Sequence, residues 1–171
     1  MDKAITTSLL IVISSLLALL LFNAAYPAVS SGAESITNIA NRAEDRMRSQ
    51  IAIIHAAAER TSTGDWQDGN GNGDFEAFLW VKNIGDTPVV AIDRLDLFFG
   101  PEGNFFRIPL GATGTDPRPN WTWQVENADR WIPSSTLKIT VHYGGIPPAA
   151  GRYFVRVTLP NGITSDLTFG M

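Results

Sequence analysis

The chain of 171 residues contains no cysteine. Disulfide bridges, thiolate zinc sites, iron–sulfur clusters and cysteine nucleophiles are therefore excluded. Basic residues are also few, because 13 Lys and Arg stand against 17 Asp and Glu, for a net charge of −4. A nucleic-acid partner would need Lys and Arg clustered on one face, so we expect none. The length allows one ordinary domain and an appendage.

Motifs of catalysis are missing as well. The sequence has no phosphate-binding loop, no G-x-S-x-G and no H-E-x-x-H. His55 and His142 have no serine or carboxylate pair near them at a recognisable spacing. Asp93 and Asp96 are three positions apart in an expected strand, so they point to opposite faces. We therefore expect a protein that is not an enzyme, with no catalytic residues and no cofactor-binding residues.

The N-terminal segment has no charged residue between Lys3 and Glu34. A bilayer core about 30 Å thick needs roughly 20 apolar residues in a helix, and residues 4–29 satisfy that length. A secretory signal would show a basic start, a shorter apolar run and a small-residue exit. Lys3 alone is a weak basic start, and the run is too long. The segment is therefore predicted to be able to span a membrane.

Apolar residues continue beyond Ala33 at spacings of three and four, with charged residues between them. This periodicity predicts an amphipathic helix. A long helix can absorb Pro27 as a kink, so we expect one helix from Ala4 to about Arg60, within an N-terminal domain of residues 1–62. It is either a membrane anchor with a stalk, or a helix that bundles with copies of itself. The residues expected to mediate polymerisation are Ile5, Leu9, Ile13, Leu16, Leu17, Leu20, Ile36, Ala43, Met47 and Ile54.

From residue 75 onward, short apolar runs alternate with Gly and Pro. Aromatic and β-branched residues fill these runs, which is typical of strands. Seven short strands in about 95 residues favour an immunoglobulin-like sandwich or a related barrel. We thus expect an α+β chain in which a long hydrophobic and amphipathic N-terminal helix precedes an all-β immunoglobulin-like sandwich at residues 75–171. The expected strands are 75–83, 89–99, 105–110, 121–126, 136–143, 152–159 and 163–169.

The stretch DGNGNGDFE, residues 68–76, carries the most specific small motif. Asp68, Asn70 and Asn72 followed by Gly73 match the opening of an EF-hand calcium loop. The twelfth position is Leu79 and not the closing glutamate, so Asp74 and Glu76 are the carboxylates able to substitute. The alternative is a polar hinge of residues 63–74 between helix and sandwich. No cofactor is expected to be required, and Ca²⁺ is the one candidate ion.

A single N-x-[ST] sequon occurs at Asn120-Trp121-Thr122. Its position beside Pro117 and Pro119 suggests an exposed turn. Asn120 is therefore a candidate for glycosylation in an exported protein.

Three stretches carry a resemblance to a known family: ITTSLLIVISSLLALLLFNAA, IANRAEDRMRSQIAIIHAAAE, and FLWVKNIGDTPV with LDLFFGPEGNFFRI. The chain resembles archaeal type IV pilin-like subunits, which include the archaellins and the accessory archaellum subunits FlaF and FlaG. Membership implies that the helix sits first in the membrane and then moves into the core of a helical filament. The implied partners are copies of the chain and, transiently, the cytoplasmic membrane and the assembly machinery.

The resemblance also implies a location on an extracellular surface filament, with a membrane-inserted precursor. Family members are normally made with a short basic leader, and Met1-Asp2-Lys3 supplies none. The chain then starts near the mature terminus, or its leader is vestigial, or the start site is misassigned.

Two functions follow from the resemblance and a third from the anchor alone. The first is a structural subunit of an archaellum-like or type IV pilus-like filament, for motility or adhesion. The alternative is a minor accessory subunit whose β-domain anchors the filament to the cell envelope or surface layer. The third is a monomeric anchored domain that recognises a ligand.

Overall fold

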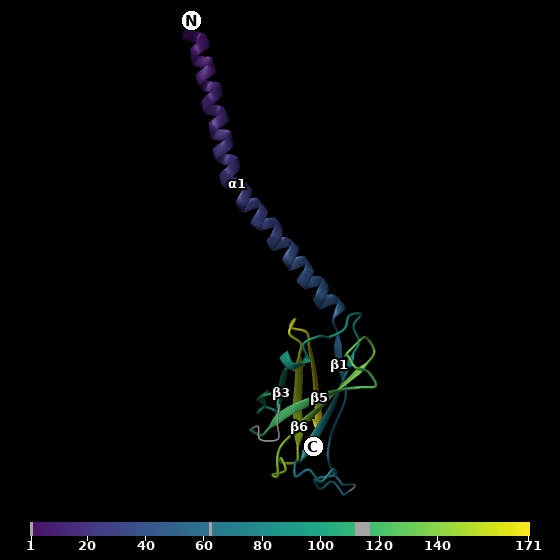
Figure 1. Ribbon diagram of the computed structural model, residues 1–171. Coiled ribbons are helices and arrows are strands. Elements are labelled where there is room, and N and C mark those ends of the chain that lie inside the picture. The colour runs from purple at the N-terminus through teal and green to yellow at the C-terminus, as the bar shows by residue number, and fades with distance from the viewer. Residues whose placement is uncertain (1, 62, 112–116) are drawn as a thin grey trace. The chain divides into compact units, whose positions relative to one another are not determined.

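A computed structural model describes residues 2–61, 63–111 and 117–171. One long helix, α1 (Asp2–Arg48), is followed by two antiparallel sheets of four strands each (Figure 1). The chain divides into two compact units, one ending at Glu44 and the other beginning at Asp45. The predicted class, a long helix followed by a β-sandwich, is confirmed.

Helix α1 continues through Pro27, as predicted, but ends at Arg48 and not near Arg60. Where the helix ends, the backbone is bonded to the loop that follows β2. The Asp86 N–H donates to the Arg48 carbonyl over 2.9 Å, and the Ile84 N–H donates to the Gln50 carbonyl, beyond the helix, at the same distance. These bonds give the last helical carbonyl a partner outside the helix and hold the chain after Arg48 against the sandwich.

The residues beyond the helix form strand β1 (Ile51–Ala58), so the prediction of helix over this stretch is wrong. Strand β1 pairs with β2 (Glu76–Asn83) in a register from Ile51 opposite Asn83 to Ala58 opposite Ala77. Ile54, assigned to the polymerisation helix, lies in this strand. The boundary at residue 62 and the hinge at 63–74 change accordingly, because the described part of that segment connects two strands of one sheet.

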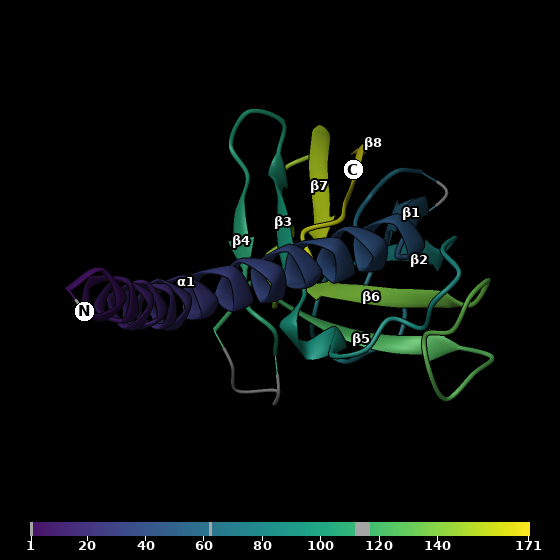
Figure 2. The ribbon, with the colours of Figure 1, turned by 90° about the horizontal axis from the view of Figure 1, so that it is seen from above.

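The two sheets complete the sandwich. One has the order β1-β2-β6-β5, with β5 spanning Asn120–Glu126 and β6 spanning Thr136–His142. The other has the order β4-β3-β7-β8. Figure 2 shows β4, β3 and β7 as a layer distinct from β6 and β5. The bounds in the second sheet are β3 (Asp96–Pro101), β4 (Phe106–Ile108), β7 (Arg152–Thr158) and β8 (Thr164–Gly170).

Most predicted strands lie within about two residues of the observed ones. The exception is the predicted run 89–99, where a short 3-10 helix, η1 (Ile92–Arg94), precedes β3. Alternate residues of β2, β6 and β7 face the space between the sheets, as a half-buried strand requires. The fully buried side chains include Leu79, Val81, Leu97, Phe99, Ile108, Trp121, Trp131, Leu137, Ile139, Val141, Val155 and Val157. The core of the chain therefore lies inside the sandwich.

Candidate functional site

The first candidate site is the surface of α1. Its apolar side chains between Ile5 and Val29 are exposed by between 44% and 70%. Burying a large aliphatic or aromatic side chain is worth about 1.5–3 kcal/mol, so the twelve such residues from Ile5 to Phe22 represent about 20–35 kcal/mol. Because so much free energy is gained when these side chains leave water, we expect this part of α1 to lie in lipid or against other apolar helices. By length and composition the helix is able to cross a membrane.

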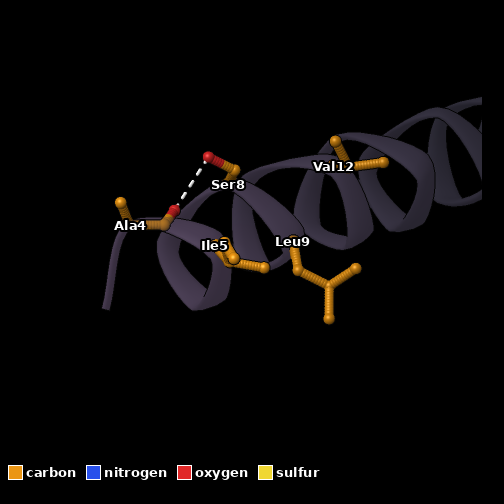
Figure 3. Close-up of a pocket in the computed structure, with 5 residues that line it drawn as sticks. All are labelled: Ala4, Ile5, Ser8, Leu9 and Val12. Carbon is orange, nitrogen blue, oxygen red and sulfur yellow. Dashed lines mark hydrogen bonds between the residues drawn. The ribbon is translucent and has the colours of Figure 1, made fainter. Parts of the chain in front are cut away.

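The hydroxyl groups within this apolar segment are satisfied by the helix itself. Thr7, Ser14 and Ser15 donate to carbonyl oxygens four residues earlier, over 2.7–2.9 Å. Figure 3 shows the same bond from Ser8 Oγ to the Ala4 carbonyl, 2.9 Å long, beside the apolar side chains on the same stretch of helix. Lipid offers no hydrogen-bonding partner, so this internal pairing removes the cost that free hydroxyls would add. The segment suits lipid and close helix packing alike.

The second half of α1 carries the predicted amphipathic stripe. Ile36 and Met47 are each 70% exposed, and Ile39 is exposed as well. Nine of the ten residues expected to mediate polymerisation lie on α1, and Ile54 does not. Polymerisation through these nine residues stays a prediction.

The second candidate site is the connection between β1 and β2, which contains the motif at residues 68–76. Asp68 closes the loop, because its Oδ1 accepts from the Asn72 N–H (3.1 Å) and its Oδ2 from the Gly73 N–H (2.8 Å). Asn72 Oδ1 in turn accepts from the Asp74 N–H over 2.8 Å. Aspartate and asparagine commonly fold turns in this way. The motif is therefore a hydrogen-bonded loop at one end of the sandwich.

Three titratable side chains meet where this loop enters β2. The β2–β6 register places Glu76 opposite His142. His142 Nδ1 lies 3.0 Å from Glu76 Oε1 and 3.5 Å from Asp74 Oδ2. Arg118 holds Asp74 through both carboxylate oxygens, with Nη2 2.6 Å from Oδ2. We call Asp74, Glu76, Arg118 and His142 the loop-end cluster.

The buried member of the loop-end cluster is Glu76, which is only 4% exposed. Asn70 Nδ2 donates to Glu76 Oε2 (3.1 Å), and Asn72 Nδ2 donates to Oε1 (2.9 Å). Of the five predicted metal ligands, Asp74 and Glu76 are brought together with His142. Asn70 and Asn72 contact Glu76 through their amide nitrogens and not through oxygen, and Asp68 turns back into its own loop. The sequence motif did not include His142, because only strand pairing brings that residue to the loop.

Glu59 lies at the start of the loop, partly buried and near two other acidic residues. Its Oε1 accepts from the Gly69 N–H over 2.7 Å. Partial burial raises the pKa of Glu59 above its usual value, and the charges of Glu76 and Asp68 raise it further. The loop therefore favours a proton or another positive charge near Glu59.

The fit of this loop to calcium is incomplete. Calcium takes six to eight oxygen ligands, usually with a bidentate carboxylate. Leu79 stands at the closing position and is fully buried in the core, and Arg118 already neutralises Asp74. Calcium binding by Asp68, Asn70, Asn72, Asp74 and Glu76 stays a prediction.

Asn120 is not in an exposed turn, so that expectation is wrong. Its side chain is fully buried at the start of β5, and Nδ2 donates to the Pro117 carbonyl over 3.2 Å. An amide nitrogen in this position is not accessible to an oligosaccharide transferase in the folded chain. The sequon alone did not reveal this, because burial of Asn120 depends on strand pairing.

Comparison with known proteins finds one relative along nearly the whole chain and solved structures that match part of it. No family model matches the sequence. An uncharacterised protein of Archaeoglobus fulgidus is 25% identical over 170 residues, which cover 96% of this chain and 95% of that one.

Among solved structures, the chain is similar to the archaellum periplasmic stator protein FlaG from Sulfolobus acidocaldarius. The TM-score is 0.52 at 22% identity, covering 71% of this chain and 99% of that one. The FlaF–FlaG stator complex of the same organism matches with a TM-score of 0.51, at 22% identity over 70% of this chain and 88% of that one. The flagellin FlaB1 of Methanocaldococcus jannaschii gives a TM-score of 0.46 at 12% identity, covering 72% of this chain and 90% of that one. The chain has the fold of the archaellum stator protein FlaG.

Proposed function

We propose that the chain is an accessory, stator-type subunit of an archaellum assembly, held in the membrane or in a helical bundle by α1. The observation that carries this proposal is the joint presence of an exposed, spanning-length apolar helix and a sandwich with the fold of FlaG. The α1 hydroxyls that bond within the helix support insertion. Catalysis is not part of the proposal, in keeping with the stator role named for the solved relatives.

The sandwich provides a scaffold that suits a role outside the bilayer. Its core is apolar and closed, whereas the loop between β1 and β2 presents Asp65 and Asn70 to solvent. The FlaF–FlaG structure shows that a sandwich of this fold pairs with a second archaellum protein in Sulfolobus. We infer that this sandwich likewise contacts another component of the assembly or of the cell envelope, and that its location is the cell surface.

A major filament subunit is the second candidate, and the exposed stripe of α1 favours it. Ile36, Ile39 and Met47 form an apolar edge beyond the spanning segment, where a membrane anchor alone has no need for one. Identical helices packed side by side would bury this edge, and small residues such as Ala40 and Ala43 would let them approach closely. Repeated contacts that do not close would give a helical filament.

Abundance separates the two functions. We would shear surface filaments from cells, image them by electron microscopy, and quantify this chain by mass spectrometry in filaments and in envelope fractions. The accessory proposal expects trace amounts in the filaments and retention in the envelope. If the chain is the main protein of fibres of uniform width, the accessory proposal fails and the filament subunit replaces it. The N-terminal residue found in the same experiment would show whether a leader is removed.

A further inference from the structure

The loop-end cluster has a feature that its hydrogen bonds do not explain. His142 Nε2 lies 2.9 Å from Thr122 Oγ1, and this bond occupies one ring nitrogen. The other, Nδ1, is buried from solvent and makes no hydrogen bond, although Glu76 Oε1 is only 3.0 Å away. The His142 side chain as a whole is 15% exposed. A buried ring nitrogen that lies beside two carboxylates without a hydrogen bond calls for an explanation, and a bound ion is one of the ordinary ones.

The tautomer of His142 sharpens this requirement. If Nε2–H donates to Thr122 Oγ1, then Nδ1 carries a lone pair and lies 3.0 Å and 3.5 Å from oxygen atoms of Glu76 and Asp74. Three acceptor atoms then converge with no proton between them. The arrangement is unfavourable for the protein by itself and favourable around a cation, since lone pairs are what a metal ion binds.

The separations come close to those around a small divalent ion. Bonds of about 2.0–2.2 Å in a tetrahedron place ligand atoms about 3.3–3.6 Å apart. The separation from His142 Nδ1 to Asp74 Oδ2 is 3.5 Å and falls in this range, whereas the separation from Nδ1 to Glu76 Oε1 is 3.0 Å, about 0.3 Å shorter. One ligand atom from each of the three residues can be chosen so that all lie within 4.8 Å of one another.

Each of these three residues also has an orienting partner. Asn70 and Asn72 donate to Glu76, Arg118 donates to Asp74, and Thr122 bonds to His142. Metal-ligating histidines and carboxylates are generally fixed by such outer contacts.

We propose that Asp74, Glu76 and His142 form a site for a divalent transition-metal ion of the zinc class, with a fourth position open to water. An imidazole nitrogen beside two carboxylates suits zinc, whereas calcium prefers oxygen ligands alone. The ion would join the start of β2, the end of β6 and the loop that follows β1. It would thereby stabilise the end of the sandwich where the sequence predicted calcium.

The test uses the full chain in detergent micelles, treated with chelator and then titrated separately with ZnCl₂, CoCl₂ and CaCl₂. The chain has two histidines and no cysteine, so His55→Gln is a matched control for His142→Gln. His55 lies on the outer face of the sheet, with its ring 5.2 Å from that of Trp80. Calorimetry would give stoichiometry and affinity, and thermal unfolding would give the shift in Tm.

We expect one Zn²⁺ per chain, a higher Tm for wild type and His55→Gln, and at least a tenfold loss of affinity in His142→Gln. Equal zinc affinity in wild type and His142→Gln would overturn the proposal, as would an equal loss in His55→Gln. So would a Tm raised by Ca²⁺ and not by Zn²⁺, which would favour the calcium loop instead.

A second readout covers the case in which His142→Gln does not fold. Co²⁺ bound at low coordination number gives strong absorption bands in the visible. The wild-type chain should therefore develop such bands on addition of one equivalent of Co²⁺, a result that needs no variant. Their absence would overturn the proposal. None of these outcomes depends on whether the chain is an accessory or a filament subunit.

Discussion

The strongest prediction concerns a charge placed in the middle of the apolar part of α1. Leu17 lies near the centre of residues 4–29 and is exposed. An arginine at the centre of a spanning helix costs about 2.5–3.5 kcal/mol, and the leucine it replaces contributes about 0.5 kcal/mol in favour. The total change of about 3–4 kcal/mol corresponds to more than a hundredfold shift in insertion, at about 1.4 kcal/mol per factor of ten.

The stability of the sandwich should not change with this substitution. Leu17 belongs to the unit that ends at Glu44, whereas all five tryptophans lie beyond Asp45. Tryptophan fluorescence therefore reports unfolding of the sandwich alone. We expect Leu17→Arg to leave the unfolding midpoint unchanged while the chain moves from the membrane pellet to the soluble or aggregated fraction.

Ile36→Arg is the matched control. It places the same charge on α1 but outside residues 4–29, so insertion should persist while self-association of the amphipathic stripe weakens. Membrane flotation measures insertion, and chemical cross-linking in vesicles measures association. A Leu17→Arg chain that inserts and cross-links like wild type would refute the assignment of α1 as the membrane and assembly element.

Four further predictions concern the sandwich. Leu79→Ala, in the fully buried centre of β2, should cost about 2–5 kcal/mol in unfolding free energy, measured with denaturant. Because the pKa of Glu59 is raised in the folded chain, protonated Glu59 stabilises the fold most below the ordinary pKa of 4.5. This stabilisation is lost as the pH rises through the folded pKa, so the Tm of the wild-type chain should fall between pH 4 and 7. Glu59→Gln should make this fall in Tm smaller. Intact mass should show no glycan on Asn120, since the residue is buried; a hexose-bearing peptide there would contradict this. Calcium added to a chelated chain tests the loop at Asp68 directly, where Asp68→Asn should abolish any rise in Tm.

The calcium and zinc experiments use the same chain and distinguish two sets of ligands, one that includes Asp68 and one that includes His142. Asp68 affects the response to a metal ion only if the loop binds calcium, because it turns away from His142 and bonds to Asn72 and Gly73. His142 matters only if the loop-end cluster binds zinc. If Asp68→Asn abolishes the rise in Tm with Ca²⁺, the loop binds calcium. If His142→Gln abolishes the rise in Tm with Zn²⁺, the loop-end cluster binds zinc.

Much of this protein could be predicted from local sequence. The absence of charge from residues 4 to 33 identifies a helix able to span a membrane, because an uncharged apolar run of that length matches the thickness of the bilayer core. Alternating apolar residues and the Gly and Pro between them located strands β2 and β4–β8 closely, since period-two burial is a property of each strand. The class of the fold followed from these two patterns.

Tertiary structure decided the rest. The apolar residues in 51–58 are spaced as in a helix, yet this stretch pairs with β2 as the edge strand of its sheet. Backbone N–H groups of the loop at residues 84–86 donate to the carbonyls of Arg48 and Gln50, which holds the stretch beside β2. The same pairing turned an expected hinge into a β1–β2 connection. His142 joined Asp74 and Glu76, and Asn120 became buried, through contacts between strands far apart in sequence. A sequence motif carries local geometry, whereas a site made by strand register exists only once the sheets have formed.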